Sequence, residues 1–131
     1  MYIFTLEYLK KALCTAHAKL GIAYHNIGQY QNAIECHRKL LEISEKLRDK
    51  GGVARAHGGL GNAYHGIGQH QKAIECLRKA VEISEELGDK CTLGNAHTNL
   101  GNASKALVNT KRQLSAIAKF WRFQKNWGTK V

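Results

Sequence analysis

The stretch AHAKLGIAYHNIGQYQNAIECHRKLLEISEKLRDK, residues 16–50, returns at residues 56–90 as AHGGLGNAYHGIGQHQKAIECLRKAVEISEELGDK. The two copies match at 24 of 35 positions without a gap, and a third copy begins at residue 96 as AHTNLGNA. A fixed period of about 20–50 residues is typical of solenoid proteins, in which each unit buries its apolar face only against its neighbours. Because a solenoid mainly presents surface, the sequence favours a non-enzymatic binding module.

Each repeat is predicted to contain two antiparallel helices joined by a short turn. In the second copy, His57, Leu60, Gly61 and Tyr64 recur at the spacing of one helix face. A glycine on this face lowers helix propensity by about 1 kcal/mol, which indicates that another helix packs closely there. A turn at Gly68 separates this helix from a second one. The second helix carries its own apolar stripe: Ala73, Leu77, Ala80, Val81, Ser84 and Leu87.

The same plan predicts an all-α fold of about six helices along the 131-residue chain. They are expected over residues 5–27, 31–48, 52–67, 71–88, 92–107 and 110–126. The repeat region is predicted to span residues 1–109, with units at about 12–51 and 52–91 and a partial unit over 92–109. Residues 110–131 are predicted to form a separate, basic amphipathic helix. Only about two and a half repeats are present, so we expect low stability.

The spacing of Leu60-Gly61, Tyr64, Gly68 and Ala73-Ile74 resembles the tetratricopeptide repeat, and residues 20–34 show the same pattern. The 40-residue unit, with the run Leu60-Gly61-Asn62-Ala63-Tyr64, is similar to the longer variant in Leu-Gly-Asn-repeat scaffold adaptors. The resemblance covers about residues 12–104 and implies a right-handed superhelix of antiparallel helix pairs. It assigns packing between helices to these residues: Leu20, Gly21, Tyr24, Ala33, Leu60, Gly61, Tyr64, Ala73, Leu100 and Gly101.

The resemblance also implies where a partner binds, because the first helices of such repeats line a concave groove. The polar residues that it places in this groove are Arg55, Asn62, His65, Asn95, Asn102 and Lys105. Asparagine amides can both donate to and accept from a peptide backbone, and the cations can bind a carboxylate. We therefore expect a groove for a peptide of a partner protein, favouring an acidic segment. The alternative is that these asparagines are only solvated or join neighbouring helices.

The basic charge of the chain belongs to its C-terminal part. The formal net charge is +10, but residues 1–104 carry 13 Lys and Arg against 10 Asp and Glu. Residues 105–131 hold the other seven basic residues and no acidic one. The segment 110–126 is predicted to cap the last repeat, since terminal repeats are commonly atypical. It is alternatively a basic amphipathic helix for an acidic membrane surface or a helix-binding groove, or, less favoured, for nucleic acid.

Two further interpretations of the chain stay open. The open ends of the array can pair, which would make the protein a self-associating structural element. The abrupt loss of the repeat pattern after Ala103 is also typical of a fragment of a longer array.

Catalytic, metal and cofactor sites are not expected. His57 and His65 are eight residues apart, which separates them by about 12 Å along a helix, too far to share one metal ion. Cys14, Cys36, Cys76 and Cys91 form no Cys-x-x-Cys pair and are expected to be free thiols in a reducing compartment. With no apolar run of about 18 residues and no recognisable signal peptide, we expect a cytoplasmic protein.

Overall fold

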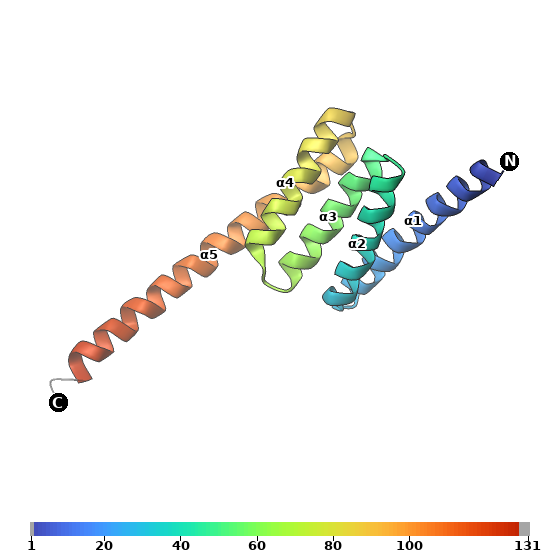
Figure 1. Ribbon diagram of the computed structural model, residues 1–131. Helices are drawn as coiled ribbons and strands as arrows, with labels where there is room; N and C mark the ends of the chain where they lie inside the picture. The colour runs from blue at the N-terminus through green and yellow to red at the C-terminus, as the bar shows by residue number, and fades with distance from the viewer. Residues whose placement is uncertain (1, 129–131) are drawn as a thin grey trace.

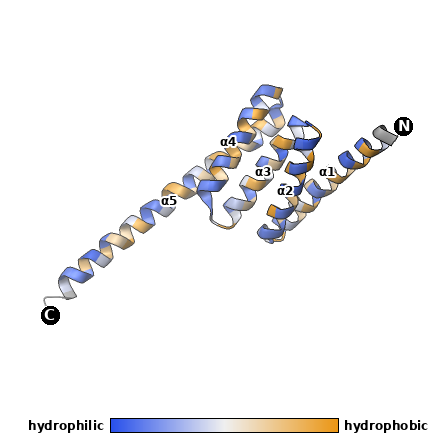
Figure 2. Ribbon diagram, viewed as in Figure 1, coloured by the Kyte–Doolittle hydropathy of each residue, from blue (hydrophilic) through white to orange (hydrophobic). Residues whose placement is uncertain are grey.

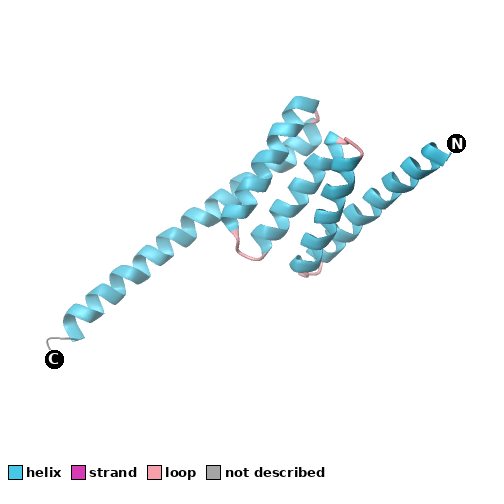
Figure 3. Ribbon diagram, viewed as in Figure 1, coloured by secondary structure: helices cyan, strands magenta, loops and turns pink. Residues whose placement is uncertain are grey.

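The computed structural model describes residues 2–128, with side chains for residues 5–127, and these residues are helical apart from short turns (Figures 1 and 3). The all-α fold predicted from the repeats is therefore confirmed. The helices are α1 (Tyr2–Asn26), α2 (Tyr30–Lys46), α3 (Lys50–Gly66), α4 (His70–Leu87) and α5 (Lys90–Gly128). Helices that follow one another in sequence pack side by side, and α1, α3 and α5 form the second set of neighbours.

Glycine in the left-handed conformation ends three of the helices. Gly28 and Gly68 both have a φ angle of 80°, and Gly88 has one of 68°. Glycine adopts positive φ readily because it has no Cβ atom. Arg48 stands 40 residues before Gly88 and is the one non-glycine residue with positive φ, 55°, in the described part of the chain. The repeat period therefore fixes the turns as well as the helices.

The core consists of small clusters between neighbouring helices. Ala33 and Ile34 of α2 pack with Leu60 and Ala63 of α3, and the partly buried Tyr24 and Tyr64 lie against this cluster. A second cluster joins α4 to α5 and contains Ala73, Ile74, Leu77 and Ala103, with Leu100 and Leu107 against it. A third contains Cys14, Leu40 and Ala56. The buried residues of each cluster come from helices that pack directly against one another, as the solenoid interpretation requires.

Helices of one repeat approach each other at glycine. A Cβ atom on Gly61 would lie 2.5 Å from Cγ of Leu77, and one on Gly21 would lie 2.6 Å from Cε1 of His37. His37 and Leu77 are equivalent positions of the second helices, 40 residues apart. The buried second-helix side chain therefore occupies the space that the glycine leaves open.

The terminal repeats lack some of these neighbours. Gly101 is the third glycine of the series, yet no atom outside its own helix would lie within 4 Å of a Cβ atom there. Leu20, the equivalent of the buried Leu60, is 46% exposed. The expected packing roles of Leu20 and Gly101 are thus unfilled, because Leu60 packs on the preceding helix α2 and Gly61 on the following helix α4.

The largest departure from the sequence prediction is the length of α5. The expected break between residues 107 and 110 is absent, and α5 continues as one helix to Gly128, well beyond the other helices (Figure 1). Val108 stands 40 residues after Gly68, whose φ is 80°. A β-branched valine strongly disfavours that conformation, so the chain continues as helix where the earlier repeats turn.

The structure also does not show the predicted cap over the last repeat. Residues 108–127 are all exposed. In α4, Ala80 and Ser84 are completely buried, but 40 residues later the chain carries Phe120 and Gln124. Phe120 and Gln124 are larger than Ala80 and Ser84 and would overfill the equivalent buried positions. Overfilling a core typically lowers stability by about 1–3 kcal/mol, which disfavours folding of this segment back onto the last repeat.

Candidate functional site

A concave pocket of about 290 Å³ lies between α1, α2, α3 and the start of α5. Ala18, Ile22, His37 and Leu40 form its side on α1 and α2, and Arg55, Gly58, Gly59 and Asn62 its base on α3. The side on α5 consists of Thr92, Asn95, Ala96 and Asn99. The pocket thus joins three successive first helices of the repeats. It is apolar on one side and polar on the other.

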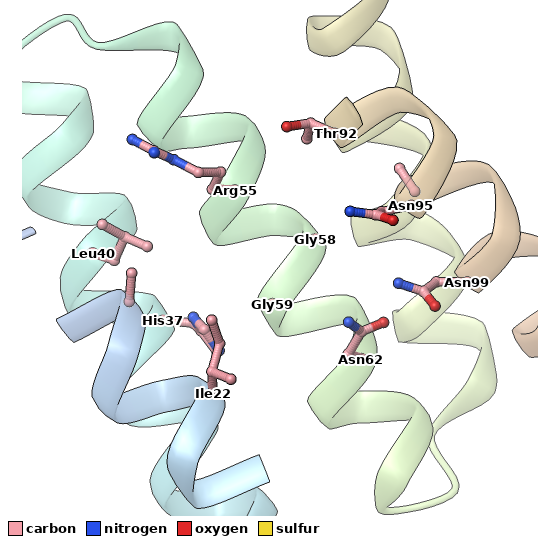
Figure 4. Close-up of a pocket in the computed structure, with 12 residues that line it drawn as sticks. Ile22, His37, Leu40, Arg55, Gly58, Gly59, Asn62, Thr92, Asn95 and Asn99 are labelled. Atoms are coloured by element: carbon pink, nitrogen blue, oxygen red, sulfur yellow. The ribbon is translucent and has the colours of Figure 1, made fainter. Parts of the chain in front are cut away.

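The polar side of the pocket consists mainly of asparagine amides. Asn62 on α3 and Asn95 and Asn99 on α5 project toward the space between the two helices (Figure 4). Asn62 and Asn99 are half-buried and Asn95 is exposed. Within the described part of the protein, none of these three amides makes a hydrogen bond. Each therefore has a free donor and a free acceptor for a peptide group.

Between the asparagines and the apolar side, the pocket is lined by glycine residues of α3, where the backbone carries no side chain. Gly58 and Gly59 are consecutive residues of α3, and Figure 4 shows them in the middle of the pocket. No neighbouring atom would lie within 4 Å of a Cβ atom on Gly58. On Gly59, by contrast, that atom would overlap the ring of His37. Gly58 therefore leaves room for a ligand, and Gly59 leaves room for the ring of His37.

Arg55 supplies the positive charge of the pocket. Its side chain is exposed, and the pocket lining contains no acidic residue. The carboxylate of Asp89 interacts electrostatically with Arg55 and caps α5 by accepting hydrogen bonds from the Thr92 hydroxyl at 2.6 Å and the Thr92 amide at 3.2 Å. These hydrogen bonds, with a smaller contribution from the charge of Arg55, lower the pKa of Asp89. Asp89 is thus committed to the helix cap, which leaves Arg55 available to an anionic group.

His37 forms part of the pocket floor as a neutral residue. Its side chain is 3% exposed, and its Nδ1 atom has no hydrogen-bond partner among the described residues. Burial, and to a smaller degree the neighbouring charge of His25, lowers the pKa of His37 to about 4. A neutral imidazole at this place serves as packing between Gly21 and Gly59.

The structure brings together half of the residues predicted for the groove. Arg55, Asn62 and Asn95 line the pocket. Asn102 and Lys105 lie farther along α5, are exposed and do not line it.

His65, the sixth predicted residue, also lies outside the pocket. Its Nδ1 atom is 3.0 Å from Nδ1 of His70 across the turn between α3 and α4. Burial lowers the pKa of His65, and the charges of His70 and His25 add to the effect. This pair joins the two helices of a repeat.

Three polar lining residues were missed by the sequence analysis: Thr92, Asn99 and His37. Thr92 lies in the first turn of α5, three residues before Asn95, and Asn99 lies about one helical turn after Asn95, so the helical period could have included both. His37 belongs to a second helix, which the groove argument did not consider.

The described residues form neither a metal-binding cluster nor a membrane-spanning helix. Among them, no three His, Cys, Asp or Glu side chains gather in a metal-binding arrangement. Within the same part of the chain, no helix combines the length and the apolar character needed to cross a bilayer. The four cysteines are free thiols, and burial raises the pKa of Cys36 and Cys76.

Comparison with known proteins gives the same picture of the fold. The family model of the tetratricopeptide repeat matches residues 8–86, more than half of the chain. The crystal structure of the tetratricopeptide-repeat domain of Arabidopsis FLU superposes with a TM-score of 0.60 at 20% sequence identity. That match covers 84% of this chain and 98% of the Arabidopsis domain, and at this identity it supports the fold alone. No curated protein sequence matches the chain.

The tetratricopeptide repeat is generally a non-enzymatic fold that binds other proteins. The matched residues 8–86 contain α2, α3 and most of α1 and α4. Of these helices, α1 and α2 form the apolar side of the pocket and α3 forms its base. Two gap-free 40-residue repeats, helix pairs that pack through glycine, and the family match agree with one another. This chain belongs to the tetratricopeptide repeat family and is a protein-interaction module of repeated helix pairs.

Proposed function

We propose that the protein binds a short acidic segment of a partner protein in the concave pocket. The observation that carries the proposal is the set of three unpartnered amides, Asn62, Asn95 and Asn99, around the open backbone of Gly58. Amides with free donors and acceptors match the alternating donors and acceptors of a peptide main chain. Most functional pockets with few polar groups use those groups to fix the orientation of a ligand.

The two sides of the pocket favour a ligand of mixed character. Ala18, Ile22 and Leu40 offer an apolar side to an aliphatic side chain of the ligand. Arg55 offers a guanidinium group, which binds carboxylates through charge-assisted hydrogen bonds. The preferred segment therefore presents an apolar residue to α1 and a carboxylate to α3. A small pocket of this kind suits an affinity near micromolar, or about −8 kcal/mol.

The test begins with selection of peptides from a displayed library on the full chain. Peptides that bind should be enriched in Asp or Glu near an aliphatic residue. In titration calorimetry, the Asn62→Ala, Asn95→Ala double variant should lose about tenfold or more in affinity, since each neutral hydrogen bond contributes about 0.5–1.5 kcal/mol. Arg55→Ala should lose about 10–100-fold for acidic peptides, because bonds to charged groups contribute about 1.5–3 kcal/mol.

A matched control removes two amides elsewhere. Gln31 and Gln71 are exposed on α2 and α4, and neither lines this pocket. The Gln31→Ala, Gln71→Ala variant should bind the selected peptides as the unaltered chain does. Equal affinity of the pocket variant and this control would refute binding in the pocket, provided that both variants remain folded by circular dichroism.

A further inference from the structure

The part of α5 beyond Leu107 lies outside the repeat array. We call residues 108–127 the α5 extension. It projects away from the packed helices (Figure 1), and every one of its residues is exposed. The proposed peptide pocket uses only the start of α5, so this segment requires a separate explanation.

Helical geometry divides the extension into an apolar and a basic side. At about 100° per residue, the large apolar residues cover roughly half of the circumference, and five cations cover most of the other half. The apolar side chains are 53–66% exposed, which is unusual for so many in one segment. They are Leu114, Ile117, Phe120, Trp121, Phe123 and Trp127. The cations are Lys111, Arg112, Lys119, Arg122 and Lys125.

The cations are concentrated near the edges of the apolar side. Arg112 and Lys119 lie within about 40° of Phe123 around the helix axis, and Lys125 lies within about 20° of Leu114 on the opposite edge. Long basic side chains in such positions can lay their methylene groups along an apolar surface and extend their charges to polar groups beside it. Figure 2 shows the alternation of apolar and polar residues along this part of α5.

We propose that the α5 extension binds the surface of a membrane that contains anionic lipids. Such a surface offers an apolar layer to the aromatic side and phosphate or carboxylate groups to the flanking cations. Helices with Trp, Phe and Leu on one side and Lys or Arg on the other lie in the membrane interface in this way. Residues 105–131 contain no acidic residue, so the segment itself offers no negative charge to its cations. Anionic lipid headgroups would supply it.

Two other occupants fit the segment less well. Pairing of the extension with that of a second copy would cover the apolar side, but it would bring ten cations together without any acidic partner. A nucleic acid could contact the cations and the aromatic ring of Phe123 beside them, but it would offer no apolar surface to the aliphatic Leu114 and Ile117 on the rest of the apolar side.

The extension and the peptide pocket share one side of α5. Ile117 follows Asn99 by 18 residues, about five helical turns, so the two side chains point in the same direction from the helix axis. The apolar side of the extension therefore continues the side of α5 that lines the pocket.

Intrinsic fluorescence can test the proposal without any label. The chain contains two tryptophans, Trp121 and Trp127, and both belong to the extension. The full chain should show a blue shift of tryptophan emission with vesicles of phosphatidylcholine and 30% phosphatidylserine, and it should sediment with them. Pure phosphatidylcholine vesicles should give little shift. Raising the salt from about 0.05 to 0.5 M should weaken the binding, because the Debye length becomes shorter.

Two variants with a matched control separate the contributions. Arg112→Glu with Lys119→Glu should bind the anionic vesicles at least about 25-fold more weakly, since each basic residue near the surface contributes roughly fivefold. Ile117→Ser with Phe120→Ser should also lose the blue shift, although it keeps every charge. Lys39→Glu with Lys79→Glu makes the same change of net charge on exposed positions of α2 and α4 and should bind normally.

Three results would overturn the proposal. The first is a chain whose tryptophan emission and sedimentation are unaffected by the anionic vesicles at low salt. The second is an equal loss of binding in the control and in the Arg112, Lys119 variant, which would show an effect of net charge alone. The third is a doubling of the 14.6 kDa mass without vesicles, accompanied by the blue shift, which would identify a second copy as the occupant.

Discussion

At the scale of single residues, glycine has two different consequences at one repeat position. Gly61 lies against Leu77 of the following helix, whereas no neighbouring atom of the described residues would lie within 4 Å of a Cβ atom on Gly101. A glycine in a helix interior lowers stability by about 1 kcal/mol relative to alanine. At position 61 the stability lost through low helix propensity is offset, because the missing Cβ atom allows Leu77 to pack closely. At position 101 no such packing offsets the loss.

Alanine at these two positions should therefore act in opposite directions. Gly61→Ala should lower the free energy of unfolding by about 1–3 kcal/mol, since Leu77 must move from a filled core. Gly101→Ala should raise it by up to about 1 kcal/mol through helix propensity. Urea unfolding followed by circular dichroism measures both. A gain in stability from both substitutions would contradict the packing of α3 against α4.

The neutral, buried His37 should make stability depend on pH. Its pKa is lowered from 6.5 to about 4 in the folded chain. Below pH 6.5 the imidazole of His37 is protonated in the unfolded chain but stays neutral in the folded chain. The free energy of unfolding therefore falls as the pH decreases toward 4. The loss is on the order of 3 kcal/mol for a shift of this size. Thermal melting between pH 4 and pH 7.5 follows it.

A leucine at position 37 provides the matched control, since Leu77 occupies the equivalent place in the second repeat. His37→Leu should flatten the pH dependence, although His57 and His65, whose pKa values burial also lowers, retain a part of it. An unchanged slope in this variant would assign the effect to other groups.

At the scale of helices, the sequence predicted the elements wherever the repeat was intact. The spacing of Leu60, Gly61 and Tyr64 sufficed for α3, and the glycine turns marked the ends of α1 and α3. Prediction failed at Val108, where the amphipathic pattern of residues 110–126 suggested a separate helix. A pattern of apolar residues specifies which side of a helix is buried, but the turn before it depends on one residue that can adopt positive φ.

Removal of the α5 extension should leave the repeats as stable as before. A chain that ends at residue 110 keeps Leu100, Ala103 and Leu107, the α5 residues of the cluster with α4. Its melting temperature should match that of the full chain within a few degrees, because the removed residues that the structure describes, 111–127, are all exposed. A decrease of about 5 °C or more, which corresponds to roughly 1 kcal/mol, would indicate that the segment caps the array after all.

At the scale of the whole molecule, three first helices are placed side by side, and residues from all of them form one pocket. Arg55, Asn62 and Asn95 could be predicted because the resemblance to the tetratricopeptide repeat implies which side of each first helix faces the groove, and the 40-residue repeat carries that side from one unit to the next. His37 could not, since its place beside Gly59 depends on how a second helix packs between two first helices. The extent of the pocket along α5 likewise depends on where the other helices end.

The central claim is that this pocket binds a segment of a partner protein. Hydrogen–deuterium exchange of the full chain, with and without a peptide selected for binding, locates the contact without any substitution. The account predicts slower exchange in residues 55–62 of α3 and 92–99 of α5, with exchange in the α5 extension unchanged. Slower exchange confined to residues 108–127, or to the outer sides of α2 and α4, would contradict it.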